Sequence, residues 1–338
     1  MRVMVTGGTG FVGSHTVAEL ARAGHGVRLL VRSAARVRPA LAPLGVEGVD
    51  GVVEGDVTDP EAVERALDGC DAVVHCASVY SLDPRATAAI RRTNVRAAEV
   101  VLGAACGRGL DPVVHVSSHV ALLGAIGAVL TPDSPPTFPP GAYARSKADS
   151  DRVARRFQEA GAPVVITYPG AVVGPHDPHF GESCQTIRNV LRGLLPLAVD
   201  GSLPITDVRD LAKLHVAVLE RGRGPRRYMA TARDLTTREM FELAARLTGR
   251  GLSTIVLPAW ALLPLVRLVD ALQVILPFRL PFNAQMVYTI SRRPRLDDSL
   301  TRQTFGLHPR DLEATIVDTV RWMVEVGRLP RYLAGKLV

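Results

Sequence analysis

The feature that most constrains the fold is a glycine-rich turn near the amino terminus. An apolar segment, residues 2–6, runs into Thr6-Gly7-Gly8-Thr9-Gly10-Phe11-Val12-Gly13, and a helical pattern begins at once. Glycine permits a tight strand-to-helix turn and lets backbone N–H groups approach an anion at the helix N-terminus. At the first strand–helix junction, this spacing is typical of a site for a dinucleotide pyrophosphate. The predicted cofactor-binding residues here are Gly7, Gly10, Phe11, Val12 and Gly13.

The amino-terminal half alternates short apolar runs with helix-length amphipathic segments. This alternation predicts βαβ units, whose right-handed crossovers place helices on both faces of a parallel sheet. The predicted strands are 2–6, 27–31, 51–54, 72–76, 112–117 and 163–168. The predicted helices are 11–23, 60–68, 84–108 and 143–160. The fold class is therefore α/β, a Rossmann-type doubly wound parallel sheet with a smaller, discontinuous C-terminal substrate lobe.

The regular alternation loosens beyond residue 168. Gly174-Pro175-His176-Asp177-Pro178 fits a loop shaped around a ligand, and a helix over 207–220 is expected to return to the main sheet. We therefore predict a nucleotide-binding domain over 1–168, with 207–224 returning to it. The substrate-binding lobe then comprises 169–206 and 225–338, and it includes a C-terminal amphipathic helix over 311–326.

The end of the second predicted strand bears on the choice of dinucleotide. An acidic residue there would bind the adenine ribose of NAD, but the segment 27–33 contains no carboxylate. Arg32 follows the strand, with Arg36 and Arg38 nearby, and a guanidinium can bind the 2′-phosphate of NADP bidentately. We predict NADP as the cofactor and Arg32 as a contact to it. NAD remains the alternative, as does a solvated surface role for these arginines.

Tyr143 and Lys147 are four residues apart in a predicted helix, so their side chains share one face. An ammonium near a phenol favours the phenolate, so Lys147 is expected to lower the pKa of Tyr143 and make it an acid–base group. Ser118 follows strand 112–117, at the sheet edge where such folds bind ligands. Strand alternation presents only one of Ser117 and Ser118 to the cleft, and we favour Ser118. The predicted catalytic residues are Ser118, Tyr143 and Lys147.

These motifs resemble those of the extended short-chain dehydrogenase/reductase family, also called the NAD-dependent epimerase/dehydratase superfamily. The resemblance covers nearly the full chain and implies hydride transfer between a nicotinamide and a substrate carbon. It assigns acid–base catalysis to Tyr143, positioning of the substrate oxygen to Ser118, and contact with the cofactor ribose to Lys147. Segments similar to the family's other cofactor-binding elements add six predicted contacts: Asp56, Val57, Ala77, Ser78, Asn94 and Pro169.

Two positions depart from the sugar-nucleotide enzymes of this family. Tyr168 stands where many members carry arginine before the proline, and Ala121-Leu122-Leu123 replaces a Val-Tyr-Gly sequence. With its apolar lobe, the chain looks closer to the dihydroflavonol reductase and 3β-hydroxysteroid dehydrogenase branch. We predict an NAD(P)-dependent oxidoreductase acting on an apolar ketone or secondary alcohol. A nucleotide-sugar-type epimerase or dehydratase with tightly bound NAD and a non-catalytic, cofactor-sensing Rossmann protein remain alternatives.

Composition narrows the partners and the compartment. The net charge of +7 comes from dispersed arginines without long basic runs, so nucleic-acid binding is not predicted. The cysteines and the three histidines beside the strand ends lack metal-ligand spacing, so neither a disulfide nor a metal site is expected. These residues are Cys70, Cys76, Cys106, Cys184, His75, His115 and His119. Because the first strand begins at once, leaving no room for a signal peptide, we expect a cytoplasmic protein.

The segment 257–277 is unusually apolar for a surface lobe. Arg267, Asp270 and Gln273 recur at every third position, which disfavours a membrane span of ~20 apolar residues. The favoured interpretation is a buried cap helix. A lid over a lipophilic substrate and a helix lying on a membrane surface remain alternatives. By resemblance alone, a homodimer packed through 84–108 and 143–160 is expected.

Overall fold

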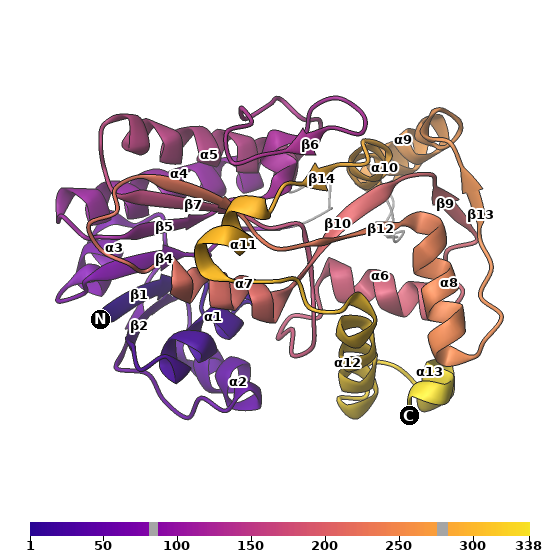
Figure 1. Ribbon diagram of the computed structural model, residues 1–338, viewed down its shortest axis with the longest axis horizontal. Helices are drawn as coiled ribbons and strands as arrows, with labels where there is room; N and C mark the ends of the chain where they lie inside the picture. Colours follow the sequence, from indigo (N-terminus) through magenta and orange to yellow (C-terminus); the bar gives the residue numbers. More distant parts are fainter. Residues whose placement is uncertain (81–86, 276–282) are drawn as a thin grey trace.

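The computed structural model describes residues 1–80, 87–275 and 283–338 and has a seven-stranded parallel sheet as its main layer (Figure 1). The strand order is β11-β7-β5-β4-β1-β2-β3. The chain adds β2 and β3 on one side of β1 and then crosses to the other side to form β4. The strands are β1 (Arg2–Thr6), β2 (Gly26–Val31), β3 (Gly51–Glu54), β4 (Ala72–His75), β5 (Val113–Val116), β7 (Val164–Tyr168) and β11 (Arg226–Met229). The predicted Rossmann-type fold is confirmed, and its six predicted strands are present.

The central strands are buried along their whole length because helices cover both faces of the sheet. One face packs against α3 (Pro60–Leu67), α4 (Thr87–Gly107) and α5 (Ala142–Glu159). The other packs against α1 (Phe11–Arg22) and α7 (Val208–Ala217), the predicted returning helix. Residues 84–86 of the predicted helix 84–108 lie outside the described residues. A short helix that we did not predict, α2 (Val37–Leu41), lies between β2 and β3.

Strand β11 falls inside the segment 225–338 that we assigned to the substrate lobe, yet it pairs with β7 at the sheet edge. Helix α11 (Ser299–Phe305) packs beside it: the Thr301 hydroxyl donates to the Met229 carbonyl, and the Phe305 and Tyr228 rings are 4.9 Å apart. The main sheet therefore draws one strand and its covering helix from beyond residue 225. The two arginines that open this four-residue strand mask its apolar pattern.

The described residues form three further small sheets. Two belong to the second lobe: one joins β8 (Ala171–Val173), β10 (Ser202–Asp207) and β12 (Arg233–Thr236), and the other joins β9 (Leu197–Val199) to β13 (Ile255–Leu257). The third joins β6 (Val129–Leu130) to β14 (Arg295–Leu296) and packs on the core of the main sheet through Leu130 and Leu296. The helices α6 (Glu182–Leu191), α8 (Thr237–Thr248), α12 (Leu312–Glu325) and α13 (Arg331–Ala334) complete the second lobe. Phe180, Phe241 and Trp322 belong to its own apolar core. Helix α8 begins with a capping box between Thr236 and Glu239.

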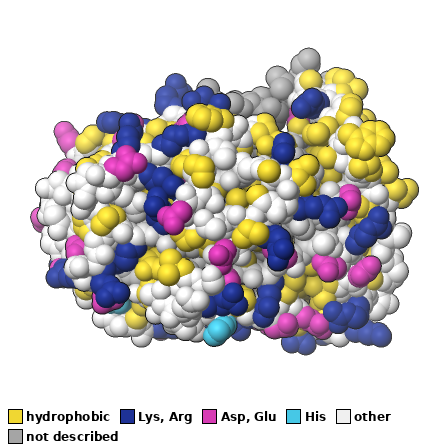
Figure 2. All heavy atoms as spheres, turned by 45° about the horizontal axis from the view of Figure 1, so that its top comes forward, with side chains coloured by type: hydrophobic (Ala, Val, Ile, Leu, Met, Phe, Trp, Pro, Cys, Tyr) yellow, Lys and Arg dark blue, Asp and Glu magenta, His cyan; other side chains and the backbone are white. Residues whose placement is uncertain are grey.

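Helices α9 (Ala259–Ile275) and α10 (Ala284–Ser291) pack together at the top of the second lobe (Figure 1). The predicted apolar segment thus contains the end of β13 and α9, while 276 and 277 lie outside the described residues. Figure 2 shows apolar side chains gathered over this end of the molecule. Among the described residues, no helix combines the length and apolarity needed to cross a bilayer. Helix α9 has one buried and one exposed face, so the expected buried cap helix is only half right: Leu262 and Val266 are buried, whereas Trp260 and Leu268 are exposed.

The exposed sides of α4 and α5 carry several arginines. Arg91, Arg92, Arg96 and Arg156 are all exposed. Arg91 and Arg96 have acidic neighbours, Asp149 and Glu99 respectively. The homodimer expected through these two helices stays a prediction.

Candidate active site

The glycine turn forms a cradle with no room for side chains. A Cβ added to Gly13 would lie 2.1 Å from the Gly7 carbonyl oxygen, and Gly7 itself has a φ of 71°. The Gly10 amide donates to the Gly7 carbonyl at 2.9 Å, which closes the turn before α1 begins. Phe11 and Val12, both half-buried, open the helix. The bare backbone at a helix N-terminus fits the pyrophosphate of a dinucleotide.

The end of β4 is tied to this turn by a buried hydroxyl. The Thr6 hydroxyl lies 2.7 Å from His75 Nδ1 and accepts the Ala77 amide at 3.2 Å. Ala77 therefore lies against Gly7, where an added Cβ would meet the Ala77 nitrogen at 2.8 Å. Ser78, the next predicted contact, is exposed. Both residues thus follow the strand beside the proposed pyrophosphate site.

Asn94 uses its amide to hold the segment that follows β4. Its Oδ1 accepts the Val79 amide at 2.7 Å, and its Nδ2 donates to the Val79 carbonyl and to the Ser146 hydroxyl. Ser146 in turn donates to the Tyr143 carbonyl at 2.8 Å. Asn94 therefore connects the chain beside the glycine turn to the helix that carries Tyr143.

The end of the cradle where the adenine ribose is predicted combines a cation with two carboxylates. Arg32 is exposed directly after β2. The hydrogen bonds from Thr58 lower the pKa of Asp56, and the charge of Arg32 adds a smaller lowering. The neighbouring Val57 is half-buried against the sheet. Glu54 pairs in register with Val31 and accepts the Ala34 amide at 2.5 Å. This carboxylate comes from the third strand, outside the segment 27–33 from which the cofactor preference was predicted.

Ser118 and Tyr143 meet at the carboxyl ends of the central strands. Ser118 is buried and precedes a short 3-10 helix, His119–Leu122, whose Val120 amide donates to the Ser118 hydroxyl at 3.4 Å. The Tyr80 ring lies edge-on to the Tyr143 ring, 4.4 Å away. Burial raises the pKa of Tyr143, and the nearby Ser118 hydroxyl opposes part of the rise. The phenol therefore keeps its proton at neutral pH and can donate it.

Lys147 lies one helical turn beyond Tyr143 and is buried. Its Nζ donates to the Val116 carbonyl at 3.0 Å, and burial lowers its pKa to about 8, against the opposing effects of Cys76 and Asp151. The expected lowering of the Tyr143 pKa by Lys147 is not found, because burial dominates at the phenol and the ammonium faces a backbone carbonyl instead. The two side chains nevertheless share the helix face that the spacing predicted.

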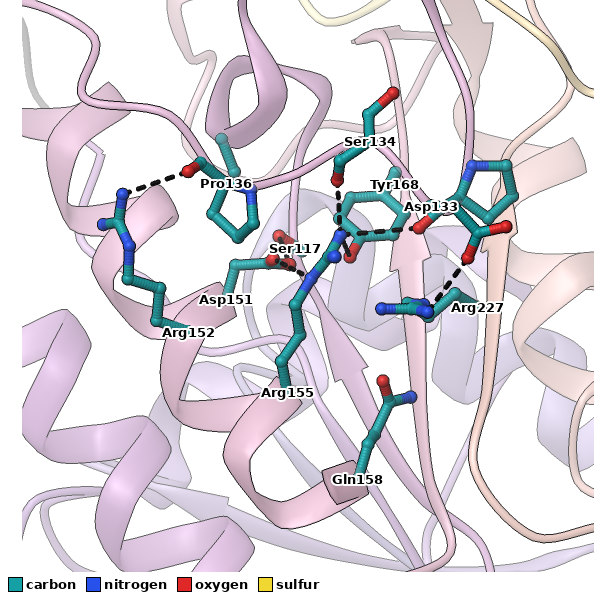
Figure 3. Close-up of polar contacts among 12 residues, drawn as sticks. Ser117, Asp133, Ser134, Pro136, Asp151, Arg152, Arg155, Gln158, Tyr168 and Arg227 are labelled. Carbon is teal, nitrogen blue, oxygen red and sulfur yellow. Dashed lines mark hydrogen bonds and ion pairs between the residues drawn. The ribbon is translucent and has the colours of Figure 1, made fainter.

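Ser117, the rival to Ser118, belongs to a separate buried network (Figure 3). Its hydroxyl donates to Asp151 at 2.9 Å, and Asp151 also receives the Arg155 Nε at 2.8 Å. Arg155 further donates to the Tyr168 hydroxyl at 2.9 Å and to the Ser134 carbonyl at 2.8 Å. The network joins the strand that ends beside Ser118 to helix α5 and to the end of β7.

This network satisfies the buried hydroxyl of Tyr168. Its side chain is fully buried, and the guanidinium beside it comes from Arg155 on α5. The next residue, Pro169, is buried too, and its carbonyl accepts the His119 amide at 3.0 Å and lies 3.1 Å from His119 Nδ1. The predicted nicotinamide-side residue Pro169 is thus fixed to the segment that follows Ser118. Neither Asp151 nor Arg155 was predicted, although Asp151 repeats the four-residue spacing of Tyr143 and Lys147.

The three histidines near the strand ends are buried beneath this site. His75 and His115 are stacked with centroids 5.5 Å apart, and neither nitrogen of His115 has a hydrogen-bond partner within the described part of the chain. Burial lowers the pKa of His75 to about 3 and that of His119 to about 4, so both are neutral. Over the described ranges, no group of three or more His, Cys, Asp or Glu residues could hold a metal ion.

An open hollow of about 740 Å³ borders the outer side of the Asp151 network. Arg155, Gln158 and Arg227 line it, and Arg227 pairs there with Asp133 at 2.9 Å (Figure 3). Tyr143 and Lys147 are not among its lining residues. This hollow is therefore separate from the predicted catalytic groups.

The parallel sheet and its glycine-lined turn define a dinucleotide-binding protein of the Rossmann class. The chain belongs to the NAD dependent epimerase/dehydratase family, whose sequence profile matches residues 3–230. Members of this family are NAD-dependent enzymes.

Several known proteins are similar to this chain over nearly its whole length. Sterol demethylase protein B of Methylococcus capsulatus is 28% identical over 97% of this chain and 100% of its own length. A putative dihydroflavonol 4-reductase of Synechocystis is 30% identical over 96% of this chain and 94% of its own length. A crystal structure of dTDP-glucose 4,6-dehydratase from Streptomyces venezuelae, with NAD bound, is 26% identical, covers 98% of this chain and 100% of its own, and has a TM-score of 0.75.

The buried network predicts a large cost for removing its cation. Arg155→Met leaves the Asp151 carboxylate buried without its ion-pair partner, so we expect a loss of roughly 3 kcal/mol in the free energy of unfolding. Urea unfolding followed by circular dichroism measures it. Arg156→Met, the adjacent and exposed position on α5, is the matched control and should change stability by less than about 0.5 kcal/mol. Equal effects of the two substitutions would contradict the importance of the network.

The lowered pKa of Lys147 predicts a pH dependence of cofactor affinity. Lys147 is a cation below about pH 8 and loses its charge above it, so a contact from its ammonium to the cofactor weakens as the pH rises. Nicotinamide fluorescence titrations between neutral and alkaline pH should show the dissociation constant rising through this range. Lys147→Arg keeps its charge and should remove the inflection. An inflection that persists in this variant would assign it to another group.

Proposed function

We propose that this protein is an NAD(P)-dependent reductase or alcohol dehydrogenase that acts on an apolar ketone or secondary alcohol. The observation that carries the proposal is the position of Ser118, directly after β5, near Tyr143 and Lys147, which are one helical turn apart on α5. These groups lie at the carboxyl ends of the strands, where folds of this kind bind their ligands. A bound nicotinamide would supply the hydride acceptor or donor.

The residues of the chain divide the remaining work. In the reductive direction the protonated Tyr143 phenol donates its proton to the substrate oxygen, and its raised pKa suits this role as an acid. The Ser118 hydroxyl donates a hydrogen bond to the same oxygen and orients it toward Tyr143. Lys147 supplies a positive charge one helical turn away, where it would hold the ribose of the cofactor. The oxidative direction requires the phenolate form of Tyr143, which takes the proton from the alcohol, so the raised pKa favours the reductive direction.

The surroundings of Tyr143 support an apolar substrate. Tyr143 contacts an apolar cluster that contains Val120, Leu123 and Tyr288. Tyr288 comes from α10, so α10 lies against the amino-terminal end of α5, and α9 packs on α10. The names of two full-length relatives refer to a sterol demethylase protein and a dihydroflavonol reductase. Both names point to hydrophobic ring systems larger than a simple sugar.

Replacing the proton donor tests the mechanism. Tyr143→Phe removes the hydroxyl and keeps the ring, so turnover of apolar ketones with NADPH should fall by about 10²-fold or more. Cofactor affinity, measured by nicotinamide fluorescence, should stay within about twofold of wild type. Tyr332→Phe, at a site 76% exposed, is the control. Retained turnover in Tyr143→Phe would refute the catalytic role. A wild-type protein that keeps NAD through purification, with no net redox change, would favour an epimerase or dehydratase.

Arg32 carries the proposed preference for NADP. If its guanidinium binds the 2′-phosphate, Arg32→Ala should weaken NADPH binding by roughly tenfold and leave NADH binding nearly unchanged. The same fluorescence titration, repeated with both cofactors, measures the ratio. Arg36→Ala, another exposed arginine of this turn, serves as the control. Equal losses for NADPH and NADH would mean that Arg32 contacts a part common to both cofactors. The preference for NADP would then be refuted, and the Glu54 carboxylate would favour NAD.

A further inference from the structure

Helix α9 is apolar on the face it exposes as well as on the face it buries. Leu262 and Val266 pack inward against Val199 and Val287. A second row points outward, with exposed fractions of 78% for Trp260, 48% for Leu265, 58% for Leu268 and 39% for Leu272. A helix that is apolar on all sides usually lies in a protein core or in contact with lipid. Within the described part of the chain, the outward row of α9 is not covered by other residues.

The neighbouring strands enlarge this apolar surface. Ile255 opens β13, just before α9, and is 62% exposed. Leu194 precedes β9, to which β13 is paired, and is 51% exposed. We call the whole set the α9 patch. Its members are Leu194, Ile255, Trp260, Leu265, Leu268 and Leu272. An exposed apolar area of this kind marks a contact surface.

The charges near the α9 patch favour one kind of partner. The stretch 252–272 contains only two charged residues, Arg267 and Asp270. Arg267 is exposed on α9, whereas the Asp270 carboxylate turns to the Ala284 amide at 2.9 Å and is partly buried. Cationic side chains also lie at the margin of the apolar area in Figure 2, and the whole chain carries a net charge of +7. The patch therefore combines apolar side chains with accessible positive charge.

A second copy of the chain fits this pattern less well than a lipid surface. In a symmetric pair the same patch meets itself. Each Arg267 would then enter an apolar contact in which the α9 patch offers no carboxylate. Anionic lipid headgroups supply the missing negative charge, and the acyl boundary below them accepts tryptophan and leucine side chains.

We propose that the α9 patch docks this protein on the surface of an anionic membrane. Helix α9 lies in the plane of the interface, with Trp260, Leu265 and Leu268 below the headgroups and Arg267 among the phosphates. The helix does not span the bilayer. Because α9 packs on α10, and Tyr288 of α10 belongs to the apolar cluster around Tyr143, docking brings the cover of the candidate active site to the lipid. The docking itself is independent of the proposed reaction.

Vesicle flotation tests the proposal directly. Wild-type protein should float with vesicles that contain phosphatidylglycerol, and it should float less with pure phosphatidylcholine vesicles or in high salt. The double variant Leu265→Glu and Leu268→Glu should lose roughly tenfold or more in vesicle affinity. Val326→Glu is the matched control, because Val326 is as exposed as Leu265, at 48%, and follows α12 on the opposite side of the second lobe (Figure 1). It should float as wild type does.

A spectroscopic measurement checks the docked face in the folded protein. The chain has two tryptophans, and Trp322 is buried in the core of the second lobe. In a Trp322→Phe variant, anionic vesicles should shift the Trp260 emission to shorter wavelength. Absence of flotation or of this shift would overturn the proposal. So would a patch-dependent dimer in sedimentation with no vesicle binding. Turnover of a water-soluble ketone should be the same in the double variant and in wild type, so a failed reaction hypothesis would show separately.

Discussion

The close approach of α1 to β1 at the glycine turn is the constraint on which the rest of the structure depends. The Gly7 carbonyl stands where a side chain of residue 13 would be, so the helix can start only if both positions are glycine. This contact sets the angle at which α1 leaves the sheet and leaves backbone N–H groups uncovered at its N-terminus. The Thr6 hydroxyl then ties the end of β4 to the same turn. The contact between Gly7 and Gly13 thereby positions both sides of the predicted cofactor cradle.

Much of the fold followed from local sequence patterns. The glycine spacing and the alternation of apolar runs predicted the doubly wound sheet, and the motifs around Ser118, Tyr143 and Lys147 added the resemblance to the family; both are confirmed. The strands that escaped prediction, such as β11, are short, and they gain their stability from partners far away in the chain: Tyr228 packs on Phe305, 77 positions later. A local pattern contains no record of such a partner. For the same reason β11 and α11, which were expected in the substrate lobe, belong to the main sheet.

The candidate site shows the same limit. The spacing of Tyr143 and Lys147 placed both on one helix face, yet the sequence indicated an ammonium directed at the phenol, whereas Lys147 bonds the Val116 carbonyl. Burial, which no spacing reveals, sets the pKa of both groups. Ser117 donates to Asp151, a partner 34 positions away that the local sequence does not indicate. The carboxylate of Glu54 reaches the end of β2 only because β3 pairs in register with β2.

The contact between α10 and α5 links the two lobes at a sensitive point. The side chain of Gln285 lies so close to Gly141 that a Cβ on the glycine would be 2.1 Å from it, and Gly141 has a φ of 92°. Gly141 is the residue before α5, two positions from Tyr143. A side chain at residue 141 would need both a left-handed backbone and the place that Gln285 occupies, so this position is closed to other residues while α10 packs here. The helix that carries Tyr143 therefore begins at a contact between the two lobes, whereas its later turns are held to the main sheet by Asp151 and Arg155.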